Sequence, residues 1–325
     1  YILVLINGQK LSGDISNNID LSRINMSRVK RIEVLDGAAS SLYGSDAIAG
    51  VINIITDQPT DEVISVTNNL KVSGHGILTE SVGLDIYKGH IGSYTSFTHD
   101  RADSYQNNNL EYVKGSDTET QETIAPYFTG YRSSVISQKF TYNPTQHLAL
   151  HAGLDYSYKI TNRPETQEDI PGGTDYEMRY KGFRWNIGGI YKFNNRNSIQ
   201  ADFTVDRFRY GKEYDVETKD YAVGDYVQSK KQRSMEGQVK AILGLSSNST
   251  TIFGADWHKD YLTASSGNIE EHVYNIAAYA QHEMKFLKDF AATLGLRLTH
   301  HETFNQRLTP KATLMYAPGD FRFRA

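Results

Sequence analysis

Long runs of alternating apolar and polar residues dominate the chain from about residue 61 onward. Over 148–160 the even positions carry Leu, Ala, Tyr and Ile, whereas the odd positions include His151, Asp155 and Lys159. The same alternation recurs over 183–193, 274–286 and 290–298. Period two sustained this long predicts half-buried strands. Soluble strands usually span about 5–6 residues, whereas a tilted outer-membrane strand needs about 9–11, so the lengths favour a membrane barrel.

The connections between these strands alternate in length. Short turns are expected at 87–90, 143–146, 194–197, 246–249, 286–289 and 317–320. Connections of variable length lie between them, at 74–76, 101–132, 161–175, 212–225, 265–269 and 302–307. Short turns at one rim and longer loops at the other are typical of an outer-membrane barrel. We count about 12 complete strands and the start of another, and barrels of about 22 strands enclose a plugged lumen.

The two ends of the chain lie inside strand-like runs, at 1–6 and 321–325. A domain rarely begins and ends within strands, so we expect an internal segment of a longer protein. On the spacing seen here, completing a barrel of about 22 strands would need on the order of 200 further residues.

Residues 1–56 follow a different pattern and predict a small α+β unit. Strands are expected at 2–6, 29–35 and 50–56, the last rich in β-branched residues. Asn7-Gly8 is a turn dipeptide, and Asp20 or Ser22 is suited to cap a short helical turn. A helix of small residues over 38–43 should end at Gly44.

Composition and motifs exclude several function classes. The 325 residues contain no cysteine, which removes disulfides, thiolate catalysis and zinc–thiolate sites. The net charge of -4 gives no electrostatic signature for nucleic acid. No run approaches the roughly 20 apolar residues that a membrane helix requires. We find no G-x-S-x-G, H-E-x-x-H, Walker or dinucleotide motif, so we expect no enzyme activity and no cofactor.

One segment closely resembles a known family. Residues 29–37 (VKRIEVLDG) and 41–56 (SLYGSDAIAGVINIIT) resemble the plug domain of TonB-dependent outer-membrane receptors, and 4–11 resembles that family's first strand and turn. The chain departs from the pattern at Asp36-Gly37-Ala38, where the family usually has Arg-Gly-Pro, and at Asn7, which replaces Asp. Without that arginine, an ion pair from this point of the plug to the barrel wall is in question.

The resemblance implies a fold and a domain division. The expected fold class is β: an incomplete transmembrane antiparallel barrel, with about 12–13 of about 22 strands, around a small α+β plug. Residues 1–56 would form the C-terminal part of the plug and 57–325 the N-terminal half of the barrel. The plug motif residues, for which a purely structural role is the leading interpretation, are Arg31, Glu33, Gly37, Tyr43, Gly44, Gly50 and Asn53.

The resemblance also implies a function. Such receptors lie in the outer membrane of Gram-negative bacteria and bind a scarce nutrient, which here would be an iron chelate, either a siderophore or haem. Import into the periplasm would use TonB with ExbB and ExbD, and the TonB-binding segment is expected outside this chain. A surface lipoprotein is a further candidate partner. Cobalamin is the alternative cargo. A passive porin-like or adhesin barrel is an alternative of another class, and an enzyme barrel is a third.

Candidate ligand contacts fall in the plug apex and the outer loops. By resemblance the loop 11–18 forms the apex, with the small polar residues Ser12, Asp14, Ser16, Asn17 and Asn18. The loop 101–132 contributes Tyr105, Tyr112, Tyr127 and Tyr131, and His300 and His301 follow at the outer end of a later strand. Solvated loops and surface histidines are the competing interpretations. Loop acids, including Asp117, Glu119 and Glu122, offer calcium ligands but lack an EF-hand pattern.

Overall fold

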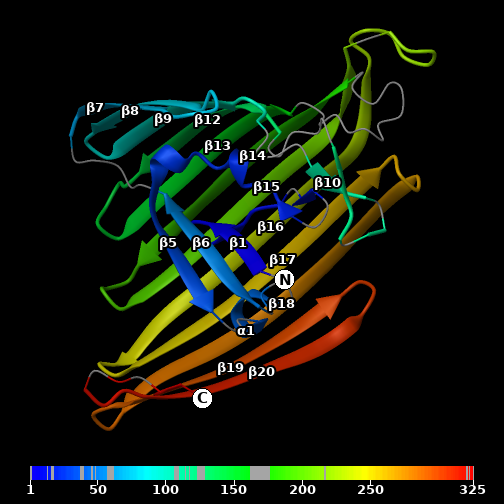
Figure 1. Ribbon diagram of the computed structural model, residues 1–325. Coiled ribbons are helices and arrows are strands. Elements are labelled where there is room, and N and C mark those ends of the chain that lie inside the picture. Colours follow the sequence, from blue (N-terminus) through cyan, green and yellow to red (C-terminus); the bar gives the residue numbers. More distant parts are fainter. Residues whose placement is uncertain are drawn as a thin grey trace.

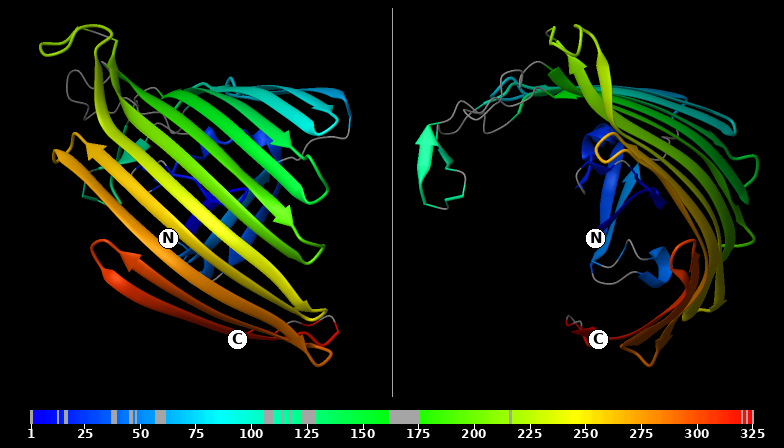
Figure 2. Two further views of the ribbon diagram at one scale, coloured as in Figure 1. Left: turned by 180° about the vertical axis from the view of Figure 1, so that it is seen from behind. Right: turned by 90° about the vertical axis from the view of Figure 1, so that its right-hand side faces the viewer.

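A curved sheet of long strands surrounds a small second sheet on its concave side (Figures 1 and 2). The computed structural model describes residues 2–12, 14–15, 18–36, 40–44, 47, 49–56, 62–105, 110–113, 115–116, 118–122, 129–161, 176–215, 217–319, 321 and 323–324. Among these residues, no helix is both long and apolar enough to cross a membrane.

The large sheet has 13 strands, each antiparallel to its neighbours in chain order. The strands are β7 (Ile64–Val72), β8 (Leu78–Lys88), β9 (Ile91–Ala102), β12 (Tyr131–Tyr142), β13 (Leu148–Thr161), β14 (Tyr176–Lys192), β15 (Asn197–Tyr214), β16 (Tyr226–Ser246), β17 (Ser249–Ala264), β18 (Ile269–Phe286), β19 (Phe290–His301), β20 (Asn305–Tyr316) and β21 (Phe323–Arg324). Twelve long strands and the start of another confirm the predicted count. The loop between β9 and β12 carries its own hairpin, β10 (Leu110–Tyr112) and β11 (Thr120–Glu122).

The strand lengths and connections agree with an outer-membrane barrel wall. The twelve long strands contain 9 to 21 residues, in the range needed to cross an apolar band at a tilt. The short turns and the longer loops join the strands at the predicted positions. On the outer face, large apolar side chains such as Phe140, Leu154 and Ile187 are about half exposed. Exposure of this kind fits a surface that faces lipid rather than water.

The plug sheet has the order β2–β1–β6–β5. Strand β1 (Ile2–Ile6) pairs in parallel with β6 (Gly50–Thr56), β2 (Gln9–Lys10) pairs with β1, and β5 (Val29–Asp36) with β6. Two small apolar clusters hold it together. One contains Leu3, Leu5, Ala47 and Val51, and the other contains Val4, Leu11, Ile24 and Ile54. The predicted strands at 2–6, 29–35 and 50–56 are confirmed.

Short helical turns connect the plug strands and face the wall. The 3-10 turns η1 (Leu21–Arg23) and η2 (Met26–Arg28) are capped by Asp20 and Asn25, whose side chains accept from backbone N–H groups two residues on. The predicted cap at Asp20 is therefore confirmed. Helix α1 (Ser40–Tyr43) precedes Gly44, whose φ of +80° marks the end of the helix, and a two-residue ladder joins β3 (Asp14–Ile15) to β4 (Asn18–Ile19). The proposed domain boundary lies beside 57–61, outside the described residues, and stays a prediction.

Candidate functional site

Arg23, at the end of η1, attaches the plug to strand β15. Its guanidinium donates to a carboxylate oxygen of Asp206 and to the backbone carbonyl of Ser12. The other Asp206 oxygen accepts from the Ser12 N–H at 3.1 Å, and the ring of Phe208 lies 4.9 Å from the guanidinium carbon. The Arg23 and Asp206 side chains are 6% and 2% exposed. Removing one partner of such a buried pair costs about 3–5 kcal/mol, so this contact fixes the apex against the wall.

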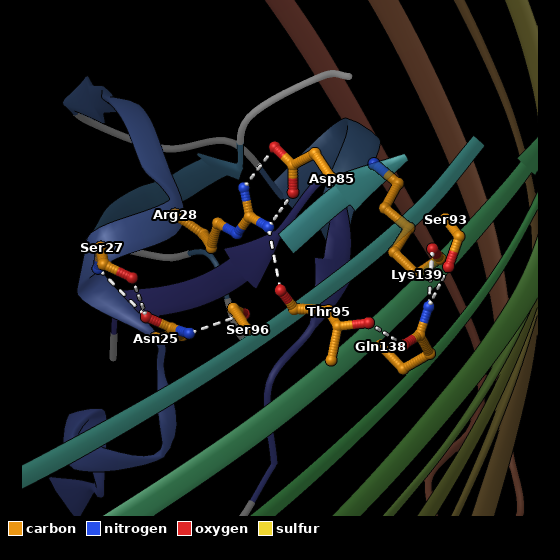
Figure 3. Close-up of polar contacts among 9 residues, drawn as sticks. All are labelled: Asn25, Ser27, Arg28, Asp85, Ser93, Thr95, Ser96, Gln138 and Lys139. Atoms are coloured by element: carbon orange, nitrogen blue, oxygen red, sulfur yellow. Dashed lines mark hydrogen bonds and ion pairs between the residues drawn. The ribbon is translucent and has the colours of Figure 1, made fainter. Parts of the chain in front are cut away.

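The η2 turn attaches the plug to β8 and β9 (Figure 3). Asn25 donates to the hydroxyl of Ser96 and accepts from that of Thr98, both at 2.8 Å. Arg28 forms a two-point ion pair with Asp85, which is almost fully buried. Both contacts are made by residues on the inward parity of their strands. The cap and the last residue of η2 thus contact two neighbouring wall strands.

The opposite side of the plug meets Arg297 of β19. Arg297 holds Asp256 through two nitrogens at 2.7 Å each and donates to the backbone carbonyl of Leu42 at 3.2 Å. Gly44 lies directly against the same guanidinium, where a Cβ atom would be 3.4 Å from one nitrogen. The wall arginine therefore links Asp256 of β17, two strands away in the sheet, to the end of α1.

Strand β2 makes a fourth set of wall contacts. The side-chain oxygen of Gln9 accepts from Arg184 at 3.1 Å and from Thr204 at 2.7 Å. The Lys10 N–H donates to a carboxylate oxygen of Glu236 at 3.1 Å. These contacts place one edge of the plug sheet against the middle of β14, β15 and β16.

A cavity of about 580 Å³ separates the plug from strands β12 to β15. Its plug side includes Gln9, Leu11 and residues of η1 and η2, and its far end reaches Asn143 and Lys192 beside the short turns. The wall side is strongly polar, with Lys139, His151, Asp155, Arg184, Asn186 and Asp202. Lys139 lies near the η2 contacts in Figure 3. The cavity thus gives a polar path along the inner wall toward the short-turn rim.

Above the plug, toward the long loops, the inner wall carries tyrosines and lysines. The ammonium group of Lys159 lies 5.8 Å from the Tyr131 ring centroid and 5.6 Å from that of Tyr180, and it reaches Asp20 at 3.4 Å. Lys212 lies 4.4 Å from the centroid of Tyr176. Rings also pair directly across strands, at 5.5 Å and 5.7 Å between centroids. We call this set the vestibule cluster: Tyr131, Lys159, Tyr176, Tyr180, Tyr210, Lys212 and Tyr214.

Of the predicted apex residues, Ser12 is described in full. The Ser12 N–H donates to Asp206 and its backbone carbonyl accepts from Arg23. The Ser12 hydroxyl is buried without a hydrogen-bond partner. Asp14 and Asn18 lie in the β3–β4 ladder, whose side chains are outside the description, and Ser16 and Asn17 lie outside the described residues. The role of the apex in binding stays a prediction.

The predicted loop residues are spread over separate places. Tyr105 stacks on His75 with ring centroids 4.0 Å apart, Tyr112 lies in the β10–β11 hairpin, and Tyr127 is outside the described residues. The calcium candidates Glu119 and Glu122 lie in and beside β11, whereas Asp117 is outside the described part of the chain. Among the loop tyrosines that the structure describes, Tyr131 alone joins the vestibule cluster.

The two histidines at the end of β19 diverge as neighbours on a strand should. His300 faces the ring of Tyr274 at 6.3 Å, whereas His301 accepts from the N–H groups of Thr303 and Phe304 and lines a small inner cavity with Arg297. No group of three or more His, Cys, Asp or Glu side chains in the described residues is arranged to hold a metal ion. A role of His300 and His301 in haem binding stays a prediction.

Three of the seven plug motif residues contact one another. Arg31 and Glu33 form an exposed ion pair at 2.7 Å, and Asn53 donates to Glu33 at 3.2 Å. The side-chain oxygen of Asn53 also accepts from the N–H of Gly8 at 2.9 Å. Gly50 has a φ of +147°, and Tyr43 packs on the first apolar cluster. Gly37 lies outside the described residues.

Alternation along the strands could have identified the vestibule cluster. Lys159 has the same parity as Asp155, and Tyr176 and Tyr180 have the same parity as the wall residue Arg184. The sequence interpretation placed ligand contacts in loops instead, because long loops usually carry function. The cross-strand register that brings Tyr180 opposite Tyr210 depends on bonding between strands that the sequence pattern does not specify.

Comparison with known families agrees with this geometry. A family model described as the TonB-dependent receptor plug domain matches residues 1–51, and one described as a TonB-dependent receptor-like β-barrel matches residues 76–325. This chain belongs to the TonB-dependent receptor family. The plug and barrel expected from the sequence are confirmed by these matches and by the fold.

Individual relatives cover the chain unevenly. The vitamin B12 transporter BtuB of Photobacterium profundum is 44% identical over 68 residues, which is 21% of this chain and 11% of the transporter. A crystal structure of the ferric enterobactin receptor PfeA of Pseudomonas aeruginosa superposes with a TM-score of 0.76 at 16% identity, covering 99% of this chain and 53% of that receptor. The siderophore receptor PirA of the same bacterium gives 0.71 at 18%, covering 99% and 52%.

The chain therefore spans about half the length of the solved receptors that it matches. At these identities the structural likeness shows the fold alone. The matched family and the similar structures are transport receptors of the Gram-negative outer membrane.

Proposed function

We propose that the full-length protein is an outer-membrane receptor that binds an iron chelate at the vestibule cluster and imports it into the periplasm. The vestibule cluster carries this proposal. Two lysines and five tyrosines face the lumen directly above the plug, with Lys159 and Lys212 each near tyrosine rings. Ammonium groups attract anionic chelates, and tyrosine rings supply stacking surface with a polar end. The siderophore receptors among the similar structures support the same cargo class.

The plug apex completes the proposed binding site from below. Lys159 connects the vestibule cluster to the plug through Asp20, and Arg23 holds the apex against Asp206. We propose that a bound chelate contacts Ser12, Asp14, Ser16, Asn17 and Asn18 from above. Residues 1–56 would then act as the plug domain and residues 57–325 as the wall. Because Asp20 caps η1, binding that alters the contact between Lys159 and Asp20 would also affect η1.

Release of the cargo requires energy from outside this membrane. A ligand bound tightly at the vestibule must leave against its own binding free energy, and we propose that TonB with ExbB and ExbD supplies the work. Displacing η2 from Asp85 and Ser96 would widen the polar cavity along β12 to β15 toward the short-turn rim. In this proposal the protein has a transport role and catalyses no reaction.

Cobalamin is the second candidate cargo, and one observation favours it. The 44% identity over 68 residues to a vitamin B12 transporter is high for so short a stretch. That stretch covers 21% of the chain. In this proposal the cargo is selected by the inner wall above the plug. The lysines there favour an anionic ligand over a bulky cobalt corrinoid.

Growth and binding experiments separate the two cargoes. Cells lacking the gene would be grown with a ferric siderophore, haem or limiting cobalamin as the sole supply. We expect loss of growth on a ferric chelate, whereas a defect on cobalamin alone would overturn the proposal.

In purified full-length receptor, Lys212→Gln should weaken chelate binding about fivefold or more. Lys285→Gln, on β18 near a short turn, is the matched control and should bind as the native protein does.

A further inference from the structure

Strands β14, β15 and β16 carry a group of basic residues on the outer face of the wall. We call Lys181, Arg207, Arg209, Lys231 and Arg233 the outer basic cluster. Their positions have the opposite parity to the wall residues Arg184, Asp206 and Glu236, which contact the plug. Since successive residues of a strand face opposite sides, the cluster faces away from the lumen. Arg207, Arg209 and Lys231 are exposed.

The register places these like charges directly opposite one another. Arg209 pairs with Lys181 on one side and with Lys231 on the other, and Arg207 pairs with Arg233. Like charges in directly opposed positions destabilise a sheet unless a counter-charge is present. Strands β14 to β16 are fully described, and their outward acids are Glu177 and Glu213. Both contact Arg179, at 3.1 Å and 3.0 Å, at the long-loop ends of the strands.

An apolar band begins immediately beside the cluster on each strand. Along β14 the outward residues after Lys181 run from Phe183 to Phe193, a length that matches the roughly 9–11 residues needed to cross the hydrocarbon layer. Ile187 is 50% exposed and Phe193 is 58% exposed. The corresponding outward residues of β15 and β16 are also apolar, over 199–205 and 235–243. The outer basic cluster therefore lies at the long-loop border of the band, at headgroup level.

Two members of the cluster are already held in place by tyrosines. The Arg233 guanidinium lies 3.9 Å from the ring centroid of Tyr261, and the Lys181 ammonium lies 5.5 Å from that of Tyr158 and 5.9 Å from that of Tyr226. Tyrosine is favoured where one end of a side chain is in lipid and the other in water. Ring contacts restrict both cations without neutralising them, so they remain available to an anion.

We propose that the outer basic cluster binds the phosphorylated headgroup of a lipid in the outer leaflet. Guanidinium groups bind phosphate oxygens through two parallel hydrogen bonds, and the lysines add point charges at the edge of the group. The bound phosphates would supply the counter-charge that the register demands. This site is independent of the cargo, since it lies on the other face of the wall from the vestibule cluster.

Lipid binding by the purified full-length receptor tests this proposal. The probe is diphosphoryl lipid A added to detergent micelles, with its dephosphorylated form for comparison, and binding is read by native mass spectrometry. The test variant carries Arg207→Gln, Arg209→Gln and Lys231→Gln. Each cation near an anionic lipid surface contributes about 1 kcal/mol, so the variant should bind the phosphorylated lipid at least about tenfold more weakly. Binding of the dephosphorylated lipid should change little.

The matched control removes three positive charges at the opposite rim, through Lys88→Gln, Arg196→Gln and Lys288→Gln. This variant should bind phosphorylated lipid as the native receptor does. Equal binding of the two lipid forms by the native receptor, or equal losses in the two triple variants, would overturn the proposal. Folding is checked by the heat-dependent shift of the barrel on a denaturing gel. Should the triple variant fail that check, single Arg209→Gln and Lys231→Gln are each expected to lose about fivefold.

Discussion

The guanidinium of Arg23 in the plug and the carboxylate of Asp206 in β15 form a buried ion pair between the two parts of the molecule. The same carboxylate accepts the backbone N–H of Ser12, so one wall residue holds both the start of the apex and the η1 turn. In the described part of the chain, plug–wall ion pairs are thus made by Asp20, Arg23 and Arg28. Position 36, where the family usually has arginine, carries aspartate in this chain.

Neutralising one partner of this pair should release the apex. Asp206→Asn leaves the Arg23 charge buried without its partner, and we expect the plug–wall contact to weaken by about 3–5 kcal/mol. Hydrogen exchange over residues 11–24 of the full-length receptor would measure the change. Arg31→Gln is the matched control, because its pair with Glu33 is about half exposed and should matter by less than about 1 kcal/mol. Similar exchange in the two variants would contradict this account of the buried pair.

Gly44→Ala should strain the backbone at the end of α1, beside the bridge made by Arg297. Alanine at the positive φ of +80° costs about 1–2 kcal/mol, and its Cβ would also lie 3.4 Å from the guanidinium. Gly8→Ala is a close control, since Gly8 has a φ of +83° with no heavy atom within 4 Å of the added Cβ. We expect equal backbone costs, with faster hydrogen exchange in α1 for Gly44→Ala only. Unchanged exchange in α1 would argue against a close fit there.

Local pattern was sufficient to predict most of the fold. Strand parity and turn spacing are properties of neighbouring residues, so the wall from β7 to β21 and its alternating connections could be read from the chain. The plug strands were found for the same reason, and Asp20 was recognised as a cap because its side chain serves the N–H two residues away.

The contacts between plug and wall could not be predicted in this way. Gln9 meets Thr204 across 195 positions, and Arg297 meets Leu42 across 255. Such pairings depend on where the plug sits in the lumen, which no local pattern encodes. The vestibule cluster was predictable only in part. The parity of Lys159 and Tyr180 was readable, but their proximity depends on the register of three neighbouring strands.

The side chain of Tyr43 should titrate above the ordinary pKa of a tyrosine. Burial and then the nearby Glu33 carboxylate raise the pKa of Tyr43 above the ordinary 10.0. The folded state therefore keeps a proton that the unfolded chain loses, and this contribution to stability is complete below pH 10 and falls as pH rises through the folded pKa. The difference in phenolate absorbance between native protein and Tyr43→Phe should show a midpoint above pH 10. A midpoint at or below 10 would be inconsistent with a desolvated hydroxyl.

Under the proposed function, locking the plug to the wall should block import without preventing ligand binding. These 325 residues contain no cysteine, so Asn25→Cys with Ser96→Cys gives this stretch a single pair, at side chains that now share a 2.8 Å hydrogen bond. Under oxidising conditions the receptor should bind the ferric chelate with native affinity but transport should fall at least about tenfold, and a reductant should restore it. Either single cysteine variant controls for the lost hydrogen bond. Undiminished transport through the oxidised pair would show that η2 stays on β9 during import, and the cavity along β12 to β15 would then need to open by movement of other plug segments.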